Sequence, residues 1–275
     1  MKIELDIALV KSYYKPRLAD SHKGNHGHAL LVAGSKGMMG AAIISSRACL
    51  RSGIGLLSIL LPESERTILQ QSVPEAMLAF ELPGKKKIHQ YSAVAIGPGM
   101  GTEKNAKEQL EKIISAAPQK LLLDADALNI LATNKKLLAL LPKQTILTPH
   151  IKEFDRIFGE HKTNEQRIRT AKAAAKKWKI IIVLKNATTI ITDGKHGVYN
   201  NRQNAGLAKG GSGDMLTGIM LAFLAQGYMP LEAAMMAVYI HSTAAAKCLT
   251  TQSEESMLAT DVIEYIGAAF ETLKN

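Results

Sequence analysis

The chain alternates between short apolar runs, many of them rich in β-branched residues, and longer segments in which apolar residues recur every three or four positions. The short runs predict strands at residues 28–33, 56–61, 93–96, 120–123, 145–147, 180–184 and 188–192. The longer segments predict helices at residues 40–52, 65–72, 103–116, 151–158, 164–177, 214–226, 231–249 and 260–273. Strands that alternate with helices are typical of a mainly parallel sheet covered on both faces. The predicted fold class is therefore α/β, a three-layer α/β/α sandwich.

The composition favours one large domain. The chain has 275 residues, 47% of them hydrophobic, and no Pro-rich, Ser-rich or low-complexity spacer divides it. Such a length fits one α/β domain better than two small ones. We therefore expect a single domain over residues 1–275.

Several features predict a cytoplasmic protein without membrane spans. Residues 1–6 carry acids where a secretory signal needs a basic start and an apolar run. The most apolar segments, 215–224 and 233–240, end before they reach membrane-spanning length, so we expect buried helices there. Cys49 and Cys248 lie far apart and belong to no paired metal or redox motif, which suits a reducing compartment.

The formal net charge of +10 raises the question of nucleic-acid binding. The lysines are spread over many predicted helices, and aromatic residues amount to 5% without any alternation of basic and aromatic positions. Base stacking therefore has little support, and we expect no nucleic-acid partner. A basic field also attracts small polyanions such as nucleotides, which are the preferred ligand class.

Five glycine-rich or polar segments follow predicted strands directly. They are residues 34–37, 97–101, 124–126, 148–150 and 185–186. In sheets of this kind ligands bind beyond the carboxyl ends of the strands. We therefore expect the five segments to line one rim of the sheet, together with the loop at 210–214.

The segment Lys-Gly-Gly-Ser-Gly-Asp at 209–214 leads straight into an apolar predicted helix. Its glycines allow several N–H groups to turn toward one anion, and the positive end of the helix adds to the attraction. A carboxylate beside an anion site has a use if it takes a proton from an attacking hydroxyl, so Asp214 is the candidate catalytic base. The plainer alternative is that Asp214 only caps the helix.

Other candidates at strand ends each have a structural alternative. Asp124 could orient a ligand hydroxyl or a magnesium-bound water, whereas Asp126 is expected to cap the following helix. His150 could contact a ligand or be a surface or capping group. Lys185 could pair with a nucleotide phosphate or be an exposed turn lysine. The loop 97–101 could approach a ligand closely or be a turn without a ligand.

Two further patterns limit the kinds of metal site and nucleotide site that the sequence predicts. His22, His26 and His28 have no cysteine or carboxylate partners at ligand spacing, so a ligand-facing loop is preferred to a zinc site. The sequence contains neither a P-loop nor a dinucleotide-binding glycine pattern after its first predicted strand. Any nucleotide must bind in another way.

Taken in order, the motifs resemble those of a known family. They are His22-Lys23-Gly24 through Gly27, Met38-Met39-Gly40-Ala41, Leu50 to Leu56, Gly97 to Gly101, Asp124 to Asn129, Thr148 to Glu153, Val183-Leu184-Lys185 and Lys209 to Gly218. Over nearly everything from His22 to the C-terminus the chain resembles the ADP/ATP-dependent NAD(P)H-hydrate dehydratases, a branch of the ribokinase-like superfamily.

The resemblance implies a ribokinase-like fold and the ADP- or ATP-dependent dehydration of hydrated NADH and NADPH in the S form. The ring hydroxyl would be phosphorylated, with Asp214 as base, and phosphate would leave; Mg²⁺ would accompany the nucleotide. The residues implied to bind the hydrated cofactor are Ala41, Gly99, Gly101, His150 and Asp214. Those implied to bind the nucleotide are Lys185, Asn186, Ala187, Thr188, Thr189, Gly211, Ser212 and Gly213. No metal ligand is implied.

Two positions depart from the family pattern. Ile151-Lys152-Glu153 stands where Pro-Gly-Glu is usual, and Asn186 stands where glycine is usual. Asparagine tolerates left-handed backbone angles better than most residues, so Asn186 is compatible with the turn. Lys152 adds a charge near the rim and leaves the preference between ATP and ADP open.

The resemblance also bears on partners. Many relatives carry a fused epimerase domain, whereas about two dozen residues precede the first predicted strand here, so we expect the epimerase to be a separate protein. A homo-oligomer, with a tetramer as one form, is implied. Two alternatives stay open: a ribokinase-superfamily kinase for a vitamin precursor, and a catalytically silent nucleotide-binding regulator.

Overall fold

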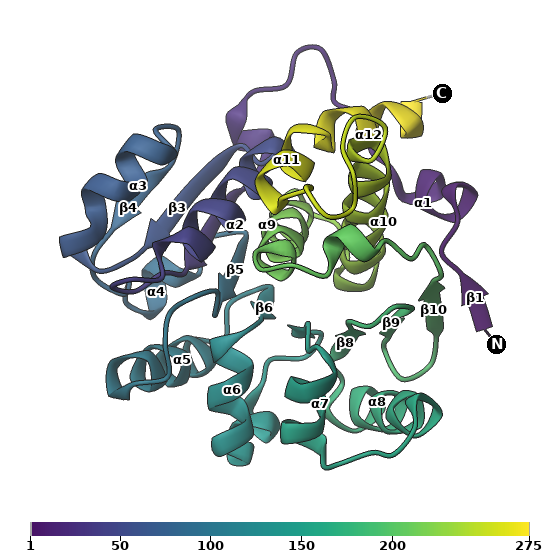
Figure 1. The fold of residues 1–275 in the computed structure, drawn as a ribbon. Coiled ribbons are helices and arrows are strands. Elements are labelled where there is room, and N and C mark those ends of the chain that lie inside the picture. The colour runs from purple at the N-terminus through teal and green to yellow at the C-terminus, as the bar shows by residue number, and fades with distance from the viewer. Residues whose placement is uncertain (1, 275) are drawn as a thin grey trace.

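The computed structural model describes residues 2–274, which form a ten-stranded sheet between two layers of helices (Figure 1). The strands are β1 (Lys2–Glu4), β2 (His28–Val32), β3 (Leu56–Leu60), β4 (Met77–Ala79), β5 (Ala93–Ile96), β6 (Leu121–Leu123), β7 (Ile146–Leu147), β8 (Ile181–Leu184), β9 (Thr189–Thr192) and β10 (Gly197–Asn200). Their order is β1-β10-β9-β8-β7-β6-β5-β2-β3-β4. Among these strands β9 pairs antiparallel with both β8 and β10, and the other pairs are parallel, so the mainly parallel sheet is confirmed.

The α-helices cover both faces of the sheet. Their bounds are α1 (Ile7–Tyr13), α2 (Met39–Arg51), α3 (Arg66–Ser72), α4 (Lys85–Ile88), α5 (Lys104–Ala116), α6 (Asp126–Thr133), α7 (Ile151–Phe158), α8 (Asn164–Trp178), α9 (Ser212–Ala225), α10 (Pro230–Cys248), α11 (Ala259–Glu264) and α12 (Ile266–Lys274). Short 3₁₀ turns lie at η1 (Lys23–His26), η2 (Glu63–Glu65), η3 (Lys135–Leu140) and η4 (Ala205–Leu207).

The seven predicted strands are confirmed to within a residue at each end, but β1, β4 and β10 were missed. The first strand is therefore β1 and not the segment at 28–33. β1 and β4 are short edge strands with half-exposed residues, and β4 contains no β-branched residue, so neither has a strong local signal. The helix expected at 260–273 is two helices, α11 and α12, which meet at Tyr265.

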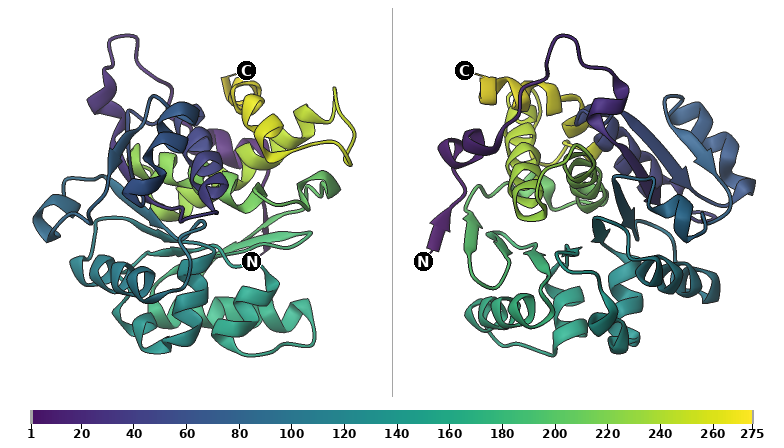
Figure 2. Two further views of the ribbon diagram at one scale, coloured as in Figure 1. Left: turned by 60° about the vertical axis from the view of Figure 1, so that its left-hand side comes forward. Right: turned by 180° about the vertical axis from the view of Figure 1, so that it is seen from behind.

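Two apolar cores lie on opposite faces of the sheet, as side-chain alternation along β2 shows. Leu31 faces the core formed with α2, α9 and α10, whereas Leu30 and Val32 face the core formed with α5 to α8. The two further views in Figure 2 show the helical layers on either side of the strands. This division is what a doubly wound sheet requires.

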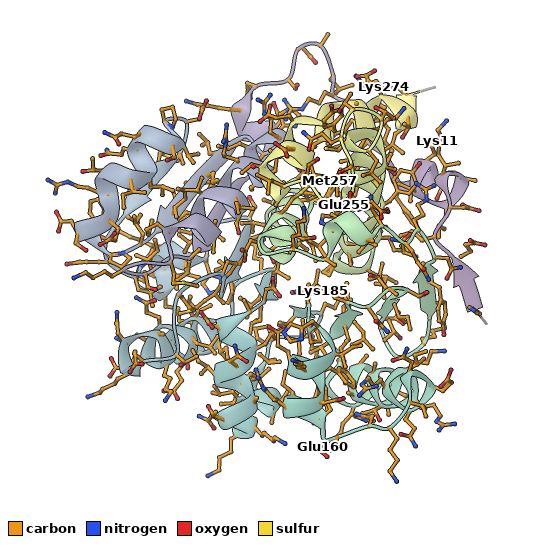
Figure 3. The ribbon with its side chains drawn as sticks, viewed as in Figure 1. Lys11, Glu160, Lys185, Glu255, Met257 and Lys274 are labelled. Atoms are coloured by element: carbon orange, nitrogen blue, oxygen red, sulfur yellow. The ribbon has the colours of Figure 1, made fainter. Side chains whose placement is uncertain are left out.

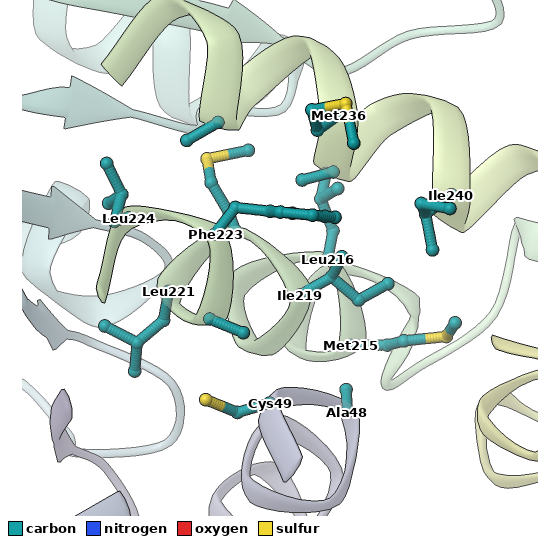
Figure 4. Packing of buried hydrophobic residues seen from close by; sticks show 14 of the residues in the cluster. Ala48, Cys49, Met215, Leu216, Ile219, Leu221, Phe223, Leu224, Met236 and Ile240 are labelled. Atoms are coloured by element: carbon teal, nitrogen blue, oxygen red, sulfur yellow. The ribbon is translucent and has the colours of Figure 1, made fainter. Parts of the chain in front are cut away.

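The apolar helices α9 and α10 are buried in the first of these cores, as expected for residues 215–224 and 233–240. In Figure 4, α9 lies between α10, which supplies Met236 and Ile240, and α2, which supplies Ala48 and Cys49. Within residues 2–274, no helix combines the length and the apolar character that crossing a membrane needs.

The contact between α9 and α2 depends on Gly218. A Cβ at this position would lie 2.1 Å from the Ser45 carbonyl oxygen and 2.9 Å from the Ala48 Cβ. The clash involves backbone, so a larger residue must push the two helices apart. Because α9 begins at the glycine-rich loop, this packing fixes where that loop lies.

Gly218→Ala is therefore expected to destabilise the fold although alanine favours helices. We expect the free energy of unfolding to fall by about 2–4 kcal/mol, because a side chain added to a packed contact strains the core. Urea unfolding followed by circular dichroism measures it. Gly267→Ala in α12 is the control, because a Cβ there would meet nothing within 4 Å. Equal effects at the two positions would contradict the packing argument.

Candidate active site

The five segments expected at one rim follow β2, β5, β6, β7 and β8 at their carboxyl ends, as predicted. Backbone hydrogen bonds join neighbouring loops: the Gly34 N–H donates to the Pro98 carbonyl at 2.8 Å, and the Lys185 N–H donates to the Pro149 carbonyl at 2.8 Å. The chain runs from β2 outward to β4 and then returns to place β5 on the other side of β2. The loops after β2 and β5 therefore flank the switch point, where sheets of this kind bind ligands.

Lys185 lies near the centre of the molecule, between the two helical layers (Figure 3). Its Nζ is 2.8 Å from Oδ1 of Asp124, whose side chain is 1% exposed. The Thr217 hydroxyl, in the second turn of α9, donates to Oδ2 of Asp124 at 2.7 Å. This network fastens β6, β8 and α9 together directly beneath the glycine-rich loop, so Lys185 is not the exposed turn lysine of the plainer interpretation.

Burial by itself would raise the pKa of Asp124, but the Lys185 ammonium and the hydrogen bonds from Lys185 and Thr217 hold that pKa below its usual range. Burial likewise opposes the charge on Lys185, and Asp124 and Glu153 raise the pKa of Lys185 against it. Both groups are therefore charged at neutral pH.

The glycine-rich loop ends at Gly211, which is the N-cap of α9 with a φ of 91°. A Cβ on Gly211 would also lie 2.7 Å from Cδ1 of Ile44, so glycine is required there. Ser212 and Gly213 form the first turn, with no side chain capping it. The Ser212 N–H donates to the Lys209 carbonyl at 3.5 Å, and among the described residues no acceptor is found for the Gly213 N–H, which is available for an anion.

Asp214 is the third residue of α9 and does not cap it, so the capping alternative is wrong. Burial, followed by the negative charge of Asp124, raises the pKa of Asp214 to about 6, while Lys185 opposes the shift and Asp126 adds to it. The carboxyl thus lies within the field of both the Lys185 network and the loop held by Asp126. A carboxylate with a pKa near 6 is suited to proton transfer at neutral pH.

The loop at 97–101 lies against the start of α2. A Cβ on Gly99 would lie 2.9 Å from the Ala41 Cβ and 2.7 Å from the Met38 carbonyl oxygen, so these residues touch across the switch point. The Gly101 N–H donates to Oδ2 of Asp126 at 2.9 Å. The expectation that Asp126 caps α6 is wrong: Ala125 is the N-cap, and the Asp126 carboxylate holds the Gly101 loop instead.

His150 is the N-cap of α7, and its Nδ1 accepts from the N–H groups of Lys152 and Glu153 at 3.0 and 3.4 Å. Its ring stays 48% exposed, so capping leaves one side of the imidazole open. Glu153 accepts from the His150 N–H at 2.8 Å, and burial raises the pKa of this carboxyl to about 6. The backbone of His150 also pairs with that of Lys185, which places the imidazole at the same rim.

A cavity of about 300 Å³ opens beside the first turn of α9. It is lined by the loop after β8, the segment after β10, the first turn of α9 and one face of α10. The lining residues are Lys185, Asn186, Ala187, Thr189, Asn200, Arg202, Asn204, Leu207, Ala208, Ser212, Gly213, Leu216, Val238, His241 and Ser242. Among the residues expected to bind nucleotide, Thr188 and Gly211 lie outside this lining.

Comparison with known proteins assigns this arrangement to a family. The family profile described as NAD(P)H-hydrate dehydratase matches residues 29–268. The chain belongs to the NAD(P)H-hydrate dehydratase family. Its sequence is 34% identical to the ADP-dependent (S)-NAD(P)H-hydrate dehydratase of Bacillus subtilis over 275 residues, which covers 95% of this chain and 96% of that protein.

Other relatives support the same family assignment. The bifunctional NAD(P)H-hydrate repair enzyme Nnr of Vibrio cholerae is 34% identical over 96% of this chain, but the chain spans about half, 53%, of that protein's length. The Bacillus subtilis dehydratase crystallised with ATP and Mg²⁺ matches with a TM-score of 0.85, 30% identity and 98% of each chain. A ribokinase-like superfamily protein of Enterococcus faecalis matches with a TM-score of 0.86 and 26% identity over 98% of this chain and 96% of that one. The ribokinase-like fold is confirmed.

His241 lies at the site of this dehydratase-family chain, although sequence patterns did not predict it there. It comes from the middle of α10 and lies 3.2 Å from the Ser212 hydroxyl through its Nε2. The available signal was a single imidazole in the Ala- and Met-rich stretch at 233–246. The structure buries most of that stretch in the core. Arg202, stacked 4.5 Å from the Tyr239 ring centroid, gave no local signal.

The histidines at 22–28 lie at the amino end of β2, away from the rim described above. His22 caps η1, His26 pairs with Ser21 and His28 pairs with Ser58. Across residues 2–274, no group of three or more His, Cys, Asp or Glu side chains could hold a metal ion. These contacts stabilise the start of β2, at the end of the sheet opposite the candidate site.

Proposed function

We propose that this chain catalyses the ADP- or ATP-dependent dehydration of hydrated NADH and NADPH, in the S form, to NADH and NADPH. The observation that carries the proposal is the position of Asp214, a carboxyl with a pKa of about 6 in the first turn of α9, next in sequence to the cavity-lining Ser212 and Gly213 and within the influence of the Asp124, Lys185 and Asp126 charges. A relative matched over 95% of this chain and 96% of its own length is named for this reaction with ADP.

The nucleotide is proposed to occupy the cavity beside α9. Lys185, Ser212 and Gly213 line one end of it, where the Lys185 ammonium and the Gly213 N–H suit a phosphoryl group in transfer. Asn186, Ala187, Thr188 and Thr189 are proposed to hold the rest of the nucleotide, with Gly211 shaping the loop. The Bacillus subtilis dehydratase, which was co-crystallised with ATP and Mg²⁺, supports nucleotide binding by this family.

The hydrated cofactor is proposed to lie at the switch point, against Ala41, Gly99, Gly101 and His150. Asp214 removes the proton from the ring hydroxyl, whose oxygen attacks the terminal phosphorus of the nucleotide and displaces ADP from ATP or AMP from ADP. The lone pair of the ring nitrogen then expels phosphate from the carbon next to it. Loss of a proton from the following ring carbon restores the carbon–carbon double bond of the reduced cofactor. The net products are the reduced cofactor, free phosphate and the shortened nucleotide.

Mg²⁺ fits this site only as a companion of the nucleotide. The described residues offer no cluster of three ligands, and Asp124 is already engaged by Lys185 and Thr217. Magnesium commonly keeps several waters and takes other ligands from phosphates. We therefore propose that it arrives with the nucleotide phosphates, and we assign no protein ligand.

The wider setting is also proposed. We place the enzyme in the cytoplasm as a homo-oligomer, with a tetramer as one form, that works together with an epimerase. Relatives such as the Vibrio cholerae protein are named bifunctional NAD(P)H-hydrate repair enzymes. A second activity in the same repair enzyme supports the proposed pairing with an epimerase. Size-exclusion chromatography with light scattering tests the oligomer.

The pKa of Asp214 predicts the acid limb of the pH profile. Because the base must be ionised, we expect kcat/KM to fall about tenfold per pH unit below pH 6 and to level off above pH 7. Initial rates between pH 5 and 8.5 measure it, with the fold checked by circular dichroism at each pH. A profile that stays flat down to pH 5 would contradict the role of Asp214.

The deciding experiment incubates the protein with hydrated NADH and MgATP, and in parallel with MgADP, while the near-ultraviolet absorbance of reduced nicotinamide is recorded. Recovery of absorbance with release of free phosphate supports the proposal. A stable phosphorylated product from a vitamin precursor, without that recovery, would identify a kinase of the same superfamily. Nucleotide binding without any turnover would favour a regulator.

A further inference from the structure

The mechanism above gives no task to His241, although this residue lines the cavity beside α9. Its side chain is buried, with 9% of the residue exposed, and comes from the middle of α10. Nε2 lies 3.1 Å from the carbonyl oxygen of Ser212 and 3.2 Å from its hydroxyl oxygen. Both contacts converge on the first residue of α9, where the nucleotide phosphates are proposed to bind.

The chemistry of the two acceptors fixes the direction of these hydrogen bonds. A carbonyl oxygen can only accept, so Nε2 must carry the hydrogen that it faces. Burial lowers the pKa of His241 to about 4, with Lys185 adding to the shift, so the ring is neutral at pH 7 and its one N–H is on Nε2. The same N–H faces the Ser212 oxygen, which therefore accepts.

The Ser212 hydroxyl then keeps its own hydrogen for another acceptor. Among residues 2–274, no acceptor for that hydrogen is found, and Ser212 lines the cavity next to Gly213. A serine in the first turn of a helix that is free to rotate can instead bond its own backbone. The His241 N–H opposes such rotation because it holds the serine oxygen in one place.

We propose that His241 is a positioning residue that keeps the Ser212 hydroxyl aimed, as a donor, at a phosphoryl oxygen of the bound nucleotide. The inference rests on the proposed function in that it assumes phosphate binding at α9. It adds an oriented O–H to the N–H groups of the loop, from a residue 29 positions away in the chain. A hydrogen bond to a charged phosphate is among the stronger kinds.

The test compares His241→Leu, which removes the donor, with His241→Gln, whose amide can donate to the same oxygens, and with Ser212→Ala. We expect His241→Leu and Ser212→Ala each to raise the Kd for MgATP about tenfold, measured by calorimetry without hydrated cofactor. His241→Gln is expected to stay within about threefold of the parent protein. The double variant His241→Leu/Ser212→Ala is expected to bind no more weakly than Ser212→Ala, since both changes remove one interaction.

The matched control is His28→Leu. His28 also bonds a serine, through Nε2 and the Ser58 hydroxyl at 2.9 Å, but at the amino end of β2. The His28→Leu variant should leave the Kd for MgATP unchanged, even if His28→Leu and His241→Leu both lower Tm. An unchanged Kd in His241→Leu would show that His241 only packs, and additive losses in the double variant would show that it does not act through the Ser212 hydroxyl. Either result would overturn the proposal.

A measurement on the unaltered protein covers the case in which His241→Leu does not fold. Nitrogen-15 NMR of the imidazole should find the proton on Nε2, and a proton on Nδ1 alone would overturn the proposal. The binding test is independent of turnover. If MgATP binding responds as expected but hydrated NADH is not repaired, the proposed function fails and the role of His241 stands; if the parent protein binds no MgATP, both fail.

Discussion

Asp214→Asn is expected to lower kcat about 10³- to 10⁵-fold while leaving the Kd for MgATP within about threefold of the parent value. Asparagine keeps the size and polarity of the side chain but cannot accept the hydroxyl proton as a carboxylate does. The nucleotide is proposed to contact the neighbouring Ser212 and Gly213, which the substitution leaves in place. Single-turnover measurements of reduced-cofactor absorbance, with calorimetric binding of MgATP, separate the two quantities.

The same variant is expected to be more stable than the parent protein at pH 8. Because burial raises the pKa of folded Asp214 from 3.8 to about 6, ionisation disfavours the folded state, and this cost appears as pH rises from about 4 to 6. Asparagine removes the cost, so the free energy of unfolding should rise on the order of 1–3 kcal/mol above pH 7 and change little at pH 4.

A suitable control for Asp214→Asn is Asp261→Asn, which alters a first-turn carboxylate of another helix, α11. It should leave kcat unchanged and should lower stability slightly, because Asp261 accepts from the Leu258 N–H. Near-parental kcat in Asp214→Asn would rule out Asp214 as the base. Loss of activity with a lowered Tm would instead show that the side chain maintains the fold.

Lys185→Met is expected to cause the largest loss of stability among single substitutions at the site. It leaves the carboxylate of Asp124, 1% exposed, without its cation, and breaking a buried ion pair from one side typically costs about 3–5 kcal/mol. The parent pair contributes stability above pH 4, where Asp124 is ionised in both folded and unfolded states. In the variant, burial raises the pKa of Asp124, so the deficit should shrink as pH falls and the carboxyl is protonated.

Urea unfolding at pH 7.5 and pH 5 measures this effect. The double variant Lys185→Met/Asp124→Asn should recover much of the loss, since asparagine can still accept from Thr217. Lys120→Met is the matched control: Lys120 is also part-buried but donates to the carbonyl oxygens of Leu224 and Tyr228, so a loss of only about 1–2 kcal/mol is expected. Equal losses for the two lysines would contradict the importance of the Asp124 charge.

Local signals predicted most of the fold because the sheet is built from strands with strong patterns. β2, β5, β6 and β8 are continuous apolar runs, and helices separate most of them. The missed strands are short or carry few β-branched residues, and β1 is paired with β10, about 195 positions further along the chain. A strand whose partner is so distant has no neighbour in sequence to reveal it.

The sequence by itself determined the order of seven of the ten described strands and of most helices between them, together with the glycine-rich start of α9 and the polar residues after β2, β5, β6, β7 and β8, because these depend on local periodicity and on the shared direction of the strands. Only the tertiary structure decided how those residues pair. Asp124 meets Lys185 across 61 positions and Thr217 across 93, and Ser212 meets His241 across 29. Burial and neighbouring charge then set the pKa of Asp214, and neither exists until the layers close around the carboxyl group.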